Sequence, residues 1–316
     1  MKINDKREIN CSIIIPVFHN EGSINFAFNE IYSKVINNSS YTFEIIFIDD
    51  GSKDNSLNVL LNLQQQFPEL IKVIKLSRNF GQLSAILAGF SIAKGETLVN
   101  ISADLQDPPE LINEFLNYSY KDKHDIVVAC RDGRDEGFYR KCTSRFFYWL
   151  MRKLTLKNMP LGGFDFFLIS SRIKEIILSK NEANSFLQGQ ILWTGFKTKF
   201  ISYERRKRQH GKSRWTFAGK IKMLIDGVMA YSYFPIRLTS VLGGLVSLLG
   251  FIYAFIVFIG RFTGNYPFKG YAPIIILILV LSGFQMLMLG VIGEYLWRTL
   301  DQVRNRTPYV IEKIYD

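Results

Sequence analysis

The chain has 316 residues, with 39 Lys and Arg against 28 Asp and Glu, a net charge of +11 and a hydrophobic content of 48%. This composition excludes a disordered chain, a collagen-like repeat and a small disulfide-stapled scaffold. The length allows one or two domains of about 100 to 200 residues. Apolar residues are concentrated beyond Arg237, which indicates a soluble domain followed by a membrane part.

The cysteines and the first residues indicate the compartment. Cys11, Cys130 and Cys142 are odd in number and show no C-x-x-C spacing, so they favour neither a disulfide framework nor a zinc site. Residues 1–10 mix charges of both signs, and the apolar run after them is too short and too β-branched for a signal peptide. We therefore expect the N-terminal domain to stay in the reducing cytosol.

In chain order, short β-branched runs alternate with longer amphipathic stretches. The predicted strands are Cys11–Val17, Phe43–Ile48, Ile71–Leu76, Thr97–Ile101 and Asp125–Ala129. The predicted helices are Ile24–Ile36, Ser56–Phe67, Gln82–Ala93 and a segment that begins after Pro109. This alternation is typical of βαβ units and a largely parallel sheet. Ligands of such sheets bind beyond the carboxyl ends of the strands, so the loops there are the candidate site.

Two of these loops are polar clusters at the ends of hydrophobic strands. Residues 16–21 read PVFHNE, and residues 49–54 read DDGSKD. Their carboxylates suit hydrogen bonds to a ribose or a base edge, and Gly51 allows the chain to turn close to a ligand. Turn formation alone also explains these residue types, because Asp, Gly and Ser are common in turns.

A third loop, residues 102–109, reads SADLQDPP and favours a ligand site. Oxygen ligands spaced two apart on an extended segment point the same way, so we expect Asp104 and Gln106 to face one hard cation, Mg²⁺ or Mn²⁺. Such cations bridge protein carboxylates to substrate phosphates. The loop thus indicates a phosphorylated substrate.

Two later stretches, Leu238–Gly260 and Gly270–Gly293, carry no charged side chain. Each has the length of about 20 apolar residues that a membrane-spanning helix needs. A buried helical hairpin of a soluble protein is the alternative, which such long uncharged runs disfavour. Basic residues flank both stretches at 205–222 and 298–313, so the positive-inside rule places these flanks in the cytosol.

Four motifs in this order resemble those of family 2 glycosyltransferases with a GT-A fold. They are PVFHNE at 16–21, DDGS at 49–52, RNFG at 78–81 and ADLQDPPE at 103–110. Within that family the chain is similar to polyprenyl-phosphate glycosyltransferases related to dolichol-phosphate mannose synthase. It most resembles the bacterial two-span enzymes that glucosylate undecaprenyl phosphate for O-antigen modification of lipopolysaccharide, and the resemblance covers nearly the whole chain.

The resemblance implies four parts along the chain. Residues 1–213 are expected to form a cytosolic α/β GT-A domain with a mostly parallel, Rossmann-like sheet. Aromatic and basic residues interleave in 214–236, which favours amphipathic juxtamembrane helices lying in the interface. A two-helix transmembrane hairpin at 237–297 and a cytosolic C-terminal tail at 298–316 complete the expected order.

Site residues follow from the resemblance by matching motifs. It implies that the nucleotide sugar is held by Pro16, Val17, Phe18, Asn20, Glu21, Asp49, Asp50, Ser102, Ala103, Asp104, Gln106, Arg208, Lys212 and Ser213. It also implies metal binding by Asp104 and Gln106, acceptor-phosphate binding by Arg131 and Arg134, and catalytic roles for Asp165, Asp104, Arg131 and Lys212. In one departure, Ser102 stands where relatives commonly have an aspartate, which affects the number of metal ligands.

The role of Asp165 stays open between two interpretations. It follows paired glycines among aromatic residues and matches an acidic position proposed as the base in the two-span enzymes. A phosphate acceptor is already ionised near pH 7 and hardly needs a base. Asp165 is therefore also a candidate for orienting Arg131 or the metal.

These features together predict an inverting glycosyltransferase of the plasma membrane. We expect it to move a hexose, foremost glucose from UDP-glucose, to polyprenyl phosphate at the cytosolic face, as a homo-oligomer with no nucleic-acid partner. The alternatives are another sugar of the mannose or aminoarabinose type, a processive polysaccharide synthase, and a catalytically silent membrane scaffold. The segment at 190–193 lacks the Q-x-x-R-W motif of the synthases, while Ser102 is the best support for the scaffold.

Overall fold

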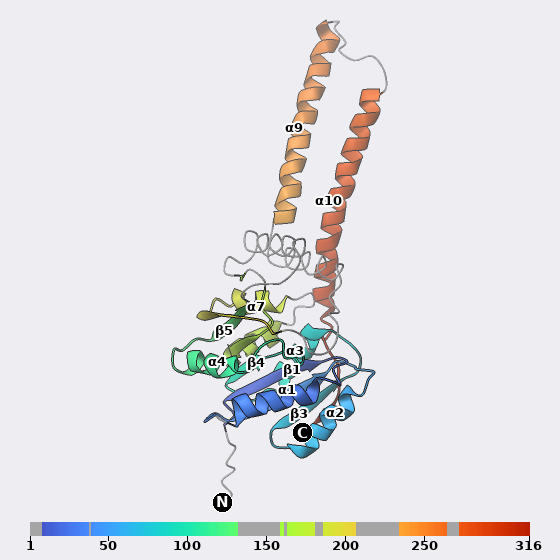
Figure 1. The fold of residues 1–316 in the computed structure, drawn as a ribbon. Coiled ribbons are helices and arrows are strands. Elements are labelled where there is room, and N and C mark those ends of the chain that lie inside the picture. Colours follow the sequence, from blue (N-terminus) through green and yellow to red (C-terminus); the bar gives the residue numbers. More distant parts are fainter. Residues whose placement is uncertain are drawn as a thin grey trace, which may run out of the picture.

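The computed structural model describes residues 8–37, 39–131, 159–160, 163–180, 186–206, 234–263 and 272–316. They form an α/β domain from which two long helices rise side by side (Figure 1). The described strands are β1 (Cys11–Val17), β2 (Phe43–Asp49), β3 (Ile71–Leu76), β4 (Thr97–Asn100), β5 (Ile126–Arg131), β6 (Phe167–Ser170), β7 (Thr198–Tyr203) and β8 (Ile311–Tyr315).

Helices cover both faces of the sheet. The described helices of the domain are α1 (Ile24–Ile31), a π-helical continuation η1 (Tyr32–Ile36), α2 (Ser56–Gln66), α3 (Gln82–Ile92), α4 (Leu111–Tyr120), α6 (Ser171–Lys180) and α7 (Leu187–Trp193). Residues of α1, α2 and α4 bury one face of the strands, and residues of α3, α6 and α7 bury the other. Along β1 the side chains alternate, with Ile13 and Ile15 in the first core and Ile14 in the second.

The described strands form one eight-stranded sheet in the order β7-β5-β6-β4-β1-β2-β3-β8. Strand β1 is parallel to β2 and β4, β2 to β3, and β5 to β7. Strand β6 runs antiparallel between β4 and β5, and β8 runs antiparallel to β3. The predicted α/β class with a mostly parallel sheet is confirmed.

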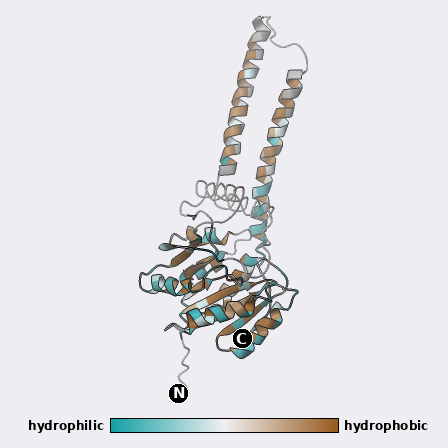
Figure 2. Ribbon diagram, in the orientation of Figure 1, coloured by the Kyte–Doolittle hydropathy of each residue, from teal (hydrophilic) through white to brown (hydrophobic). Residues whose placement is uncertain are grey.

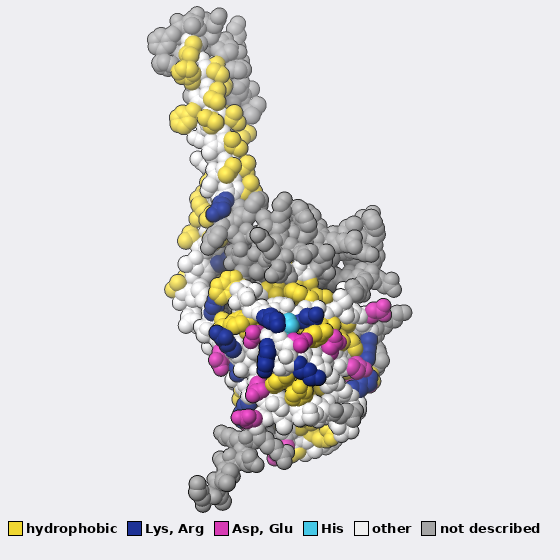
Figure 3. Space-filling view, turned by 90° about the vertical axis from the view of Figure 1, so that its left-hand side faces the viewer, with side chains coloured by type: hydrophobic (Ala, Val, Ile, Leu, Met, Phe, Trp, Pro, Cys, Tyr) yellow, Lys and Arg dark blue, Asp and Glu magenta, His cyan; other side chains and the backbone are white. Residues whose placement is uncertain are grey.

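Two long helices are α9 (Phe234–Thr263), which contains the first predicted span, and α10 (Ala272–Arg304), which contains the second from Ala272 onward; residues 270 and 271 lie outside the described residues. By length and composition both suffice to cross a membrane, and hydrophobic residues run along both in Figure 2. Only 6% and 0% of their most apolar windows are buried, whereas a soluble core helix is mostly buried. Helices α9 and α10 together form a stalk. In Figure 3 apolar side chains gather on the surface of this stalk, whereas charged side chains of both signs lie on the surface of the domain below. The juxtamembrane helices expected at 214–236 lie outside the described residues, except for 234–236, which belong to α9.

The end of the chain returns to the domain, where the sequence predicts only a cytosolic tail. After α10, strand β8 pairs with the edge strand β3, and the Ser77 amide donates a hydrogen bond to the Val310 carbonyl oxygen at 3.0 Å. Lys75 Nζ lies 2.5 Å from Glu312 Oε1 across the pair. The C-terminal segment is therefore a structural part of the sheet.

A buried carboxylate ties the amino ends of the central strands together. Glu44 in β2 is 2% exposed and accepts hydrogen bonds from Ser12 Oγ at 2.6 Å and the Lys94 amide at 2.6 Å. Its other oxygen pairs with Lys72 Nζ at 2.7 Å. Burial alone would raise the pKa of Glu44, but Lys72, Ser12 and the Lys94 amide together lower it below its ordinary value of 4.5.

Replacing Glu44 by Gln is expected to lower the free energy of unfolding by about 1.5 to 3 kcal/mol, the range for hydrogen bonds to charged groups. Because the folded-state pKa is lowered, this contribution is complete above the ordinary carboxylate pKa and is lost as the pH falls through the folded value. Denaturant unfolding monitored by circular dichroism at pH 7 and at pH 3 measures the loss of stability and its dependence on pH. Glu312, which is exposed and pairs with Lys75, supplies the control, because E312Q should change the free energy of unfolding little.

Candidate active site

Six of the described strands (β1, β2, β3, β4, β5 and β7) run in the same direction and end at one edge of the sheet, and the predicted site loops follow strands of this group. The loops after β1, β2 and β4 contain the motifs at 16–21, 49–54 and 102–109. Strands β5 and β7 end at the same edge with Arg131 and Tyr203, which are partners in the parallel register. Strand β6 begins there because it runs the opposite way, and its first residue, Phe167, pairs with Asn100 and Val128. Asp165 thus lies just beyond the carboxyl ends of its neighbours.

The first two motif loops are joined by hydrogen bonds into one unit. The amide of His19 donates to Ser52 Oγ at 3.0 Å, and that of Asn20 donates to Ser56 Oγ at 2.9 Å. In return, Glu21 Oε2 accepts from the Asn55 amide at 2.9 Å. The residues of these two loops that are predicted to bind the nucleotide are thus held in a fixed arrangement relative to one another.

Asp50 connects the second motif to the RNFG motif. Its two carboxylate oxygens accept the amides of Phe80 at 2.7 Å and Gly81 at 2.9 Å. Burial raises the pKa of Asp50 and also that of its neighbour Asp49, which accepts the Ser52 amide at 3.2 Å. Asp50 therefore fixes the backbone of the RNFG segment, a role that the sequence motifs alone do not indicate.

The predicted metal-binding loop after β4 contains a turn, whereas the residue spacing predicted an extended segment. The Leu105 amide donates to the Ser102 carbonyl oxygen at 3.2 Å, and Leu105 has a φ of 45°. Asp104 Oδ1 accepts from Ser102 Oγ at 2.8 Å and from the Gln106 amide at 3.3 Å. The side chains of Asp104 and Gln106 are therefore placed by this turn and not by strand alternation.

A divalent cation fits this loop only with help from a substrate. Among the described residues, no group of three or more His, Cys, Asp or Glu side chains is placed to hold a metal. Mg²⁺ is commonly bound by one or two carboxylates together with substrate phosphates and water. Asp104 meets that minimal requirement, with Ser102 hydrogen-bonded to it where a second carboxylate is common in relatives.

Arg131 and Asp165 form an ion pair at the carboxyl edge. Arg131 Nη2 lies 2.9 Å from Asp165 Oδ2, and the Arg131 side chain is only 10% exposed. Burial alone would lower the pKa of Arg131, but the charges of Asp165 and Asp107 raise it, so the guanidinium is firmly cationic. Gln188 Nε2 donates to Asp165 Oδ1 at 3.2 Å and to the Phe164 carbonyl oxygen at 2.9 Å. The structure brings these two predicted residues together and adds Gln188.

Asp107 is a second buried carboxylate beside this pair. It is 1% exposed, and the Tyr203 hydroxyl donates to its Oδ1. Tyr203 also accepts a hydrogen bond from Arg131 Nε at 3.4 Å, and Arg205 Nε lies 3.9 Å from Asp107 Oδ1. Burial raises the pKa of Asp107 against the opposing charge of Arg131. The sequence motifs do not indicate Tyr203 and Arg205 as site residues; the signal that could have found them is their position at the end of β7 and just beyond it.

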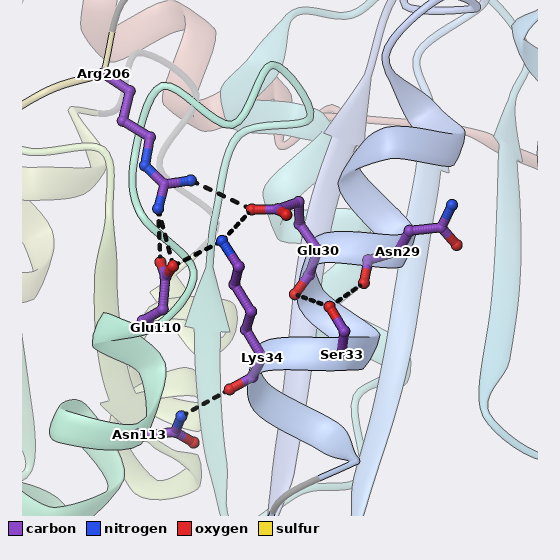
Figure 4. A network of polar contacts seen from close by, with 7 residues as sticks. All are labelled: Asn29, Glu30, Ser33, Lys34, Glu110, Asn113 and Arg206. Atoms are coloured by element: carbon purple, nitrogen blue, oxygen red, sulfur yellow. Dashed lines mark hydrogen bonds and ion pairs between the residues drawn. The ribbon is translucent and has the colours of Figure 1, made fainter.

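Arg206 fastens the chain that follows β7 (Figure 4). Its guanidinium binds both oxygens of Glu110 at 2.9 and 3.0 Å and reaches Glu30 at 3.4 Å. Lys34 bridges the same two carboxylates at 2.6 and 2.9 Å. The network joins α1, the start of α4 and the segment after β7, so it fixes where the chain leaves the domain. The expected phosphate-binding residues Arg134, Arg208, Lys212 and Ser213 lie outside the described residues.

Comparison with known proteins agrees with this arrangement. The family model "Glycosyl transferase family 2" matches residues 12–173. The "Uncharacterized glycosyltransferase YkcC" of Bacillus subtilis is 35% identical over 98% of this chain and 95% of its own length. The "SfII prophage-derived bactoprenol glucosyl transferase" of Shigella flexneri is 32% identical over 96% of this chain and 97% of its own.

The fold also has a counterpart among solved structures. Mannosyl-3-phosphoglycerate synthase from Rubrobacter xylanophilus superposes with a TM-score of 0.50 at 15% identity, covering 69% of this chain and 72% of that protein. The sheet with its carboxyl-edge loops thus defines a GT-A glycosyltransferase domain. The chain belongs to glycosyl transferase family 2, and it is a glycosyltransferase.

Replacing Gly51 by Ala is expected to disrupt the joint between the DDGS and RNFG motifs. Gly51 has a φ of 67°, and a Cβ there would lie 2.6 Å from the Arg78 carbonyl carbon. The left-handed conformation alone costs a non-glycine residue about 1 to 2 kcal/mol, and the backbone contact adds to it. UDP titration by calorimetry should show weakened binding, together with a lower midpoint of thermal unfolding. G22A is the matched control, because no atom lies within 4 Å of a Cβ at Gly22; equal behaviour of the two variants would contradict the prediction.

Proposed function

We propose that this glycosyltransferase transfers a hexose, foremost glucose from UDP-glucose, to polyprenyl phosphate with inversion at the anomeric carbon. The observation that carries the proposal is the Arg131–Asp165 ion pair at the carboxyl edge, beside the loop that contains Asp104. The alignment with a protein named bactoprenol glucosyl transferase supports it, because it spans 96% of the chain and therefore reaches both long helices. A phosphorylated lipid acceptor requires this combination of an anion site and a membrane anchor.

In the proposed reaction the acceptor phosphate oxygen attacks the anomeric carbon and the nucleoside diphosphate leaves. Arg131 is fixed by Asp165 and Tyr203, and its planar guanidinium matches the geometry of phosphate oxygens. A divalent cation at Asp104 would offset the charge that gathers on the leaving diphosphate. We assign Arg208, Lys212 and Ser213 to the same diphosphate, and Arg134 to the acceptor phosphate, from the motifs alone.

Asp165 is assigned an orienting role within this proposal. Its two oxygens are engaged by Arg131 and Gln188, at 2.9 and 3.2 Å. The acceptor is already ionised near pH 7, so removal of a proton by a base is not required. Asp165 thereby holds the guanidinium that meets the acceptor phosphate.

In the proposed topology α9 and α10 span the plasma membrane, and the domain and both chain ends are cytosolic. In the sequence, basic residues at 205–222 precede the first span and basic residues at 298–313 follow the second, and the positive-inside rule assigns both groups to the cytosol. Polyprenyl phosphate presents its charged head at the membrane surface. A domain anchored on the cytosolic side is thus positioned to receive both a soluble nucleotide sugar and a lipid phosphate.

The direct test is a transfer assay with the full-length protein. Membranes containing the protein are incubated with undecaprenyl phosphate and, in separate reactions, radiolabelled nucleotide sugars, and the lipid fraction is chromatographed. Label from UDP-glucose in a lipid product that mild acid hydrolyses supports the proposal. Label from a different nucleotide sugar would replace glucose as the donor, and absence of lipid label from every donor would favour the silent scaffold.

Replacing Asp104 by Ala is expected to abolish transfer while the domain remains folded, and a chelator should inactivate the parent protein reversibly. The reason is that Asp104 is the carboxylate assigned to the bridging cation. Since Ser102 occupies the position of a second carboxylate, S102D should reach half-maximal activity at a lower Mn²⁺ concentration than the parent. Transfer activity of the parent, D104A and S102D proteins is titrated against Mn²⁺ after EDTA treatment. Full activity of the parent protein in excess EDTA would rule out the cation.

Replacing Asp165 by Asn is expected to raise the apparent KM for undecaprenyl phosphate about ten- to a hundredfold, with UDP affinity almost unchanged. Loss of the charge-assisted contact, about 1.5 to 3 kcal/mol, releases Arg131 from its orientation. Initial rates across acceptor concentrations measure this effect. Asp125, which accepts a bond from Ser170 at the opposite end of β6, provides the control D125N. A fall in kcat with unchanged KM would instead indicate that Asp165 acts as a base.

A further inference from the structure

Arg205 lies on a segment that is fixed on both sides at the carboxyl edge. Two residues earlier, Tyr203 ends β7 as the register partner of Arg131. One residue later, the Arg206 amide donates to the Gln106 carbonyl oxygen at 2.9 Å, and Gln106 Nε2 lies 3.5 Å from the Arg206 carbonyl oxygen. The backbone of Arg205 is thereby attached both to β5 and to the loop that contains Asp104.

Arg205 lies directly beside Asp107, and Arg131 is connected to Asp107 through the Tyr203 hydroxyl. Asp107 Oδ1 lies 3.9 Å from Arg205 Nε and accepts the Tyr203 hydroxyl, which in turn contacts Arg131 Nε. Burial, followed by the positive charge of Arg131, lowers the pKa of Arg205. Two partly desolvated guanidinium groups side by side are unfavourable unless anions compensate them.

The compensation by the described residues is incomplete. Asp107 Oδ2 is buried and has no hydrogen-bond partner within the described part of the chain. Arg205 has Asp107 as its only ion-pair partner there, at 3.9 Å, beyond hydrogen-bonding distance. Its side chain is 34% exposed, so its remaining N–H donors are accessible to a ligand. By contrast, Arg206 next to it is fully engaged by Glu110 and Glu30.

We propose that Arg205 and Arg131 together bind one phosphate group of a substrate, and that Asp107, acting through Tyr203 and directly on Arg205, is the positioning residue of this pair. The inference rests on the proposed function, because it adds a second guanidinium to the acceptor region assigned there to Arg131. A phosphate group accepts several charge-assisted hydrogen bonds from arginine forks and supplies the missing negative charge. The phosphate comes either from the lipid acceptor or from the donor diphosphate.

Two binding measurements on the full-length protein in detergent distinguish these sources. Farnesyl phosphate serves as a short polyprenyl monophosphate, and UDP with Mn²⁺ represents the donor diphosphate; both are titrated by calorimetry. Neither measurement requires turnover, so both report on Arg205 even if no sugar is transferred to a lipid. The variants are R205Q, R205K, D107N and D107N/R205Q. Arg172 in α6, whose guanidinium stacks 4.8 Å from the Phe196 ring centroid, supplies the control R172Q.

R205Q is expected to lower the binding affinity for one of the two ligands about tenfold or more, as loss of a charge-assisted contact requires. The affinity for the other ligand should stay almost unchanged. Weaker farnesyl phosphate binding identifies the acceptor phosphate, and weaker UDP binding identifies the donor diphosphate. R205K should recover only part of the loss, because an ammonium keeps the charge without the fork. D107N should weaken the binding of the same ligand. The double variant should lose less binding free energy than the sum of the two single losses, since both changes act on one site.

The proposal is overturned if R205Q binds both ligands as R172Q does. The role of Asp107 is overturned if D107N weakens both ligands equally or adds its full effect to that of R205Q. Because D107N alters a buried residue, Y203F provides a milder route: it removes only the hydroxyl between Asp107 and Arg131. Y203F should weaken the binding of the same ligand as R205Q does, by a smaller factor. If Y203F binds both ligands normally, Asp107 does not position Arg131.

Discussion

The reversal of β6 is the constraint on which the candidate site depends. A parallel sheet brings carboxyl ends together, but residues that enter a strand normally lie at the opposite edge. Because β6 runs antiparallel between β4 and β5, the chain before it enters at the carboxyl edge, where Asn100 Nδ2 donates to the Asp165 carbonyl oxygen at 2.6 Å. Asp165 can then pair with Arg131 at the end of β5. A guanidinium this deeply buried requires such a partner, so the topology and the ion pair depend on each other.

Two buried carboxylates at opposite edges of the sheet have different degrees of hydrogen bonding. Glu44 has both oxygens engaged, by Ser12 and the Lys94 amide on one side and by Lys72 on the other. Asp107 has one oxygen without a hydrogen-bond partner among the described residues. A fully satisfied cluster stabilises the fold and has no capacity left for a ligand. Incomplete satisfaction is tolerated at functional sites, where a ligand completes the network.

The sequence was sufficient for the central strands and for the motifs, and insufficient for contacts made only in three dimensions. Strands β1, β2 and β4 are mainly apolar runs buried on both faces, and β3 and β5 are mostly buried, a strong pattern in a single sequence. Strand β6 has four residues, and β7 and β8 are partly exposed edge strands, so their apolar patterns are weak. The motifs indicated Asp104, Asp50 and Arg131, whereas Gln188, Tyr203 and Arg205 act through partners that are distant in the chain. The turn at Leu105 was missed because a positive φ at leucine has no sequence signal.

The edge strand β8 links the domain to the stalk more tightly than a flexible tail would. Helix α10 has 33 residues and is about 50 Å long at 1.5 Å per residue, while a hydrocarbon core is about 30 Å thick. In the proposed topology its last turns therefore extend into the cytosol, where Glu294 and Arg298 pair at 2.8 Å. Asn305 ends the helix with a φ of 46°, and the chain joins β3 within a few residues. In that topology a rigid helix and a hydrogen-bonded strand would set the height of the sheet above the bilayer and keep the carboxyl edge at a fixed distance from the phosphate of the proposed lipid acceptor.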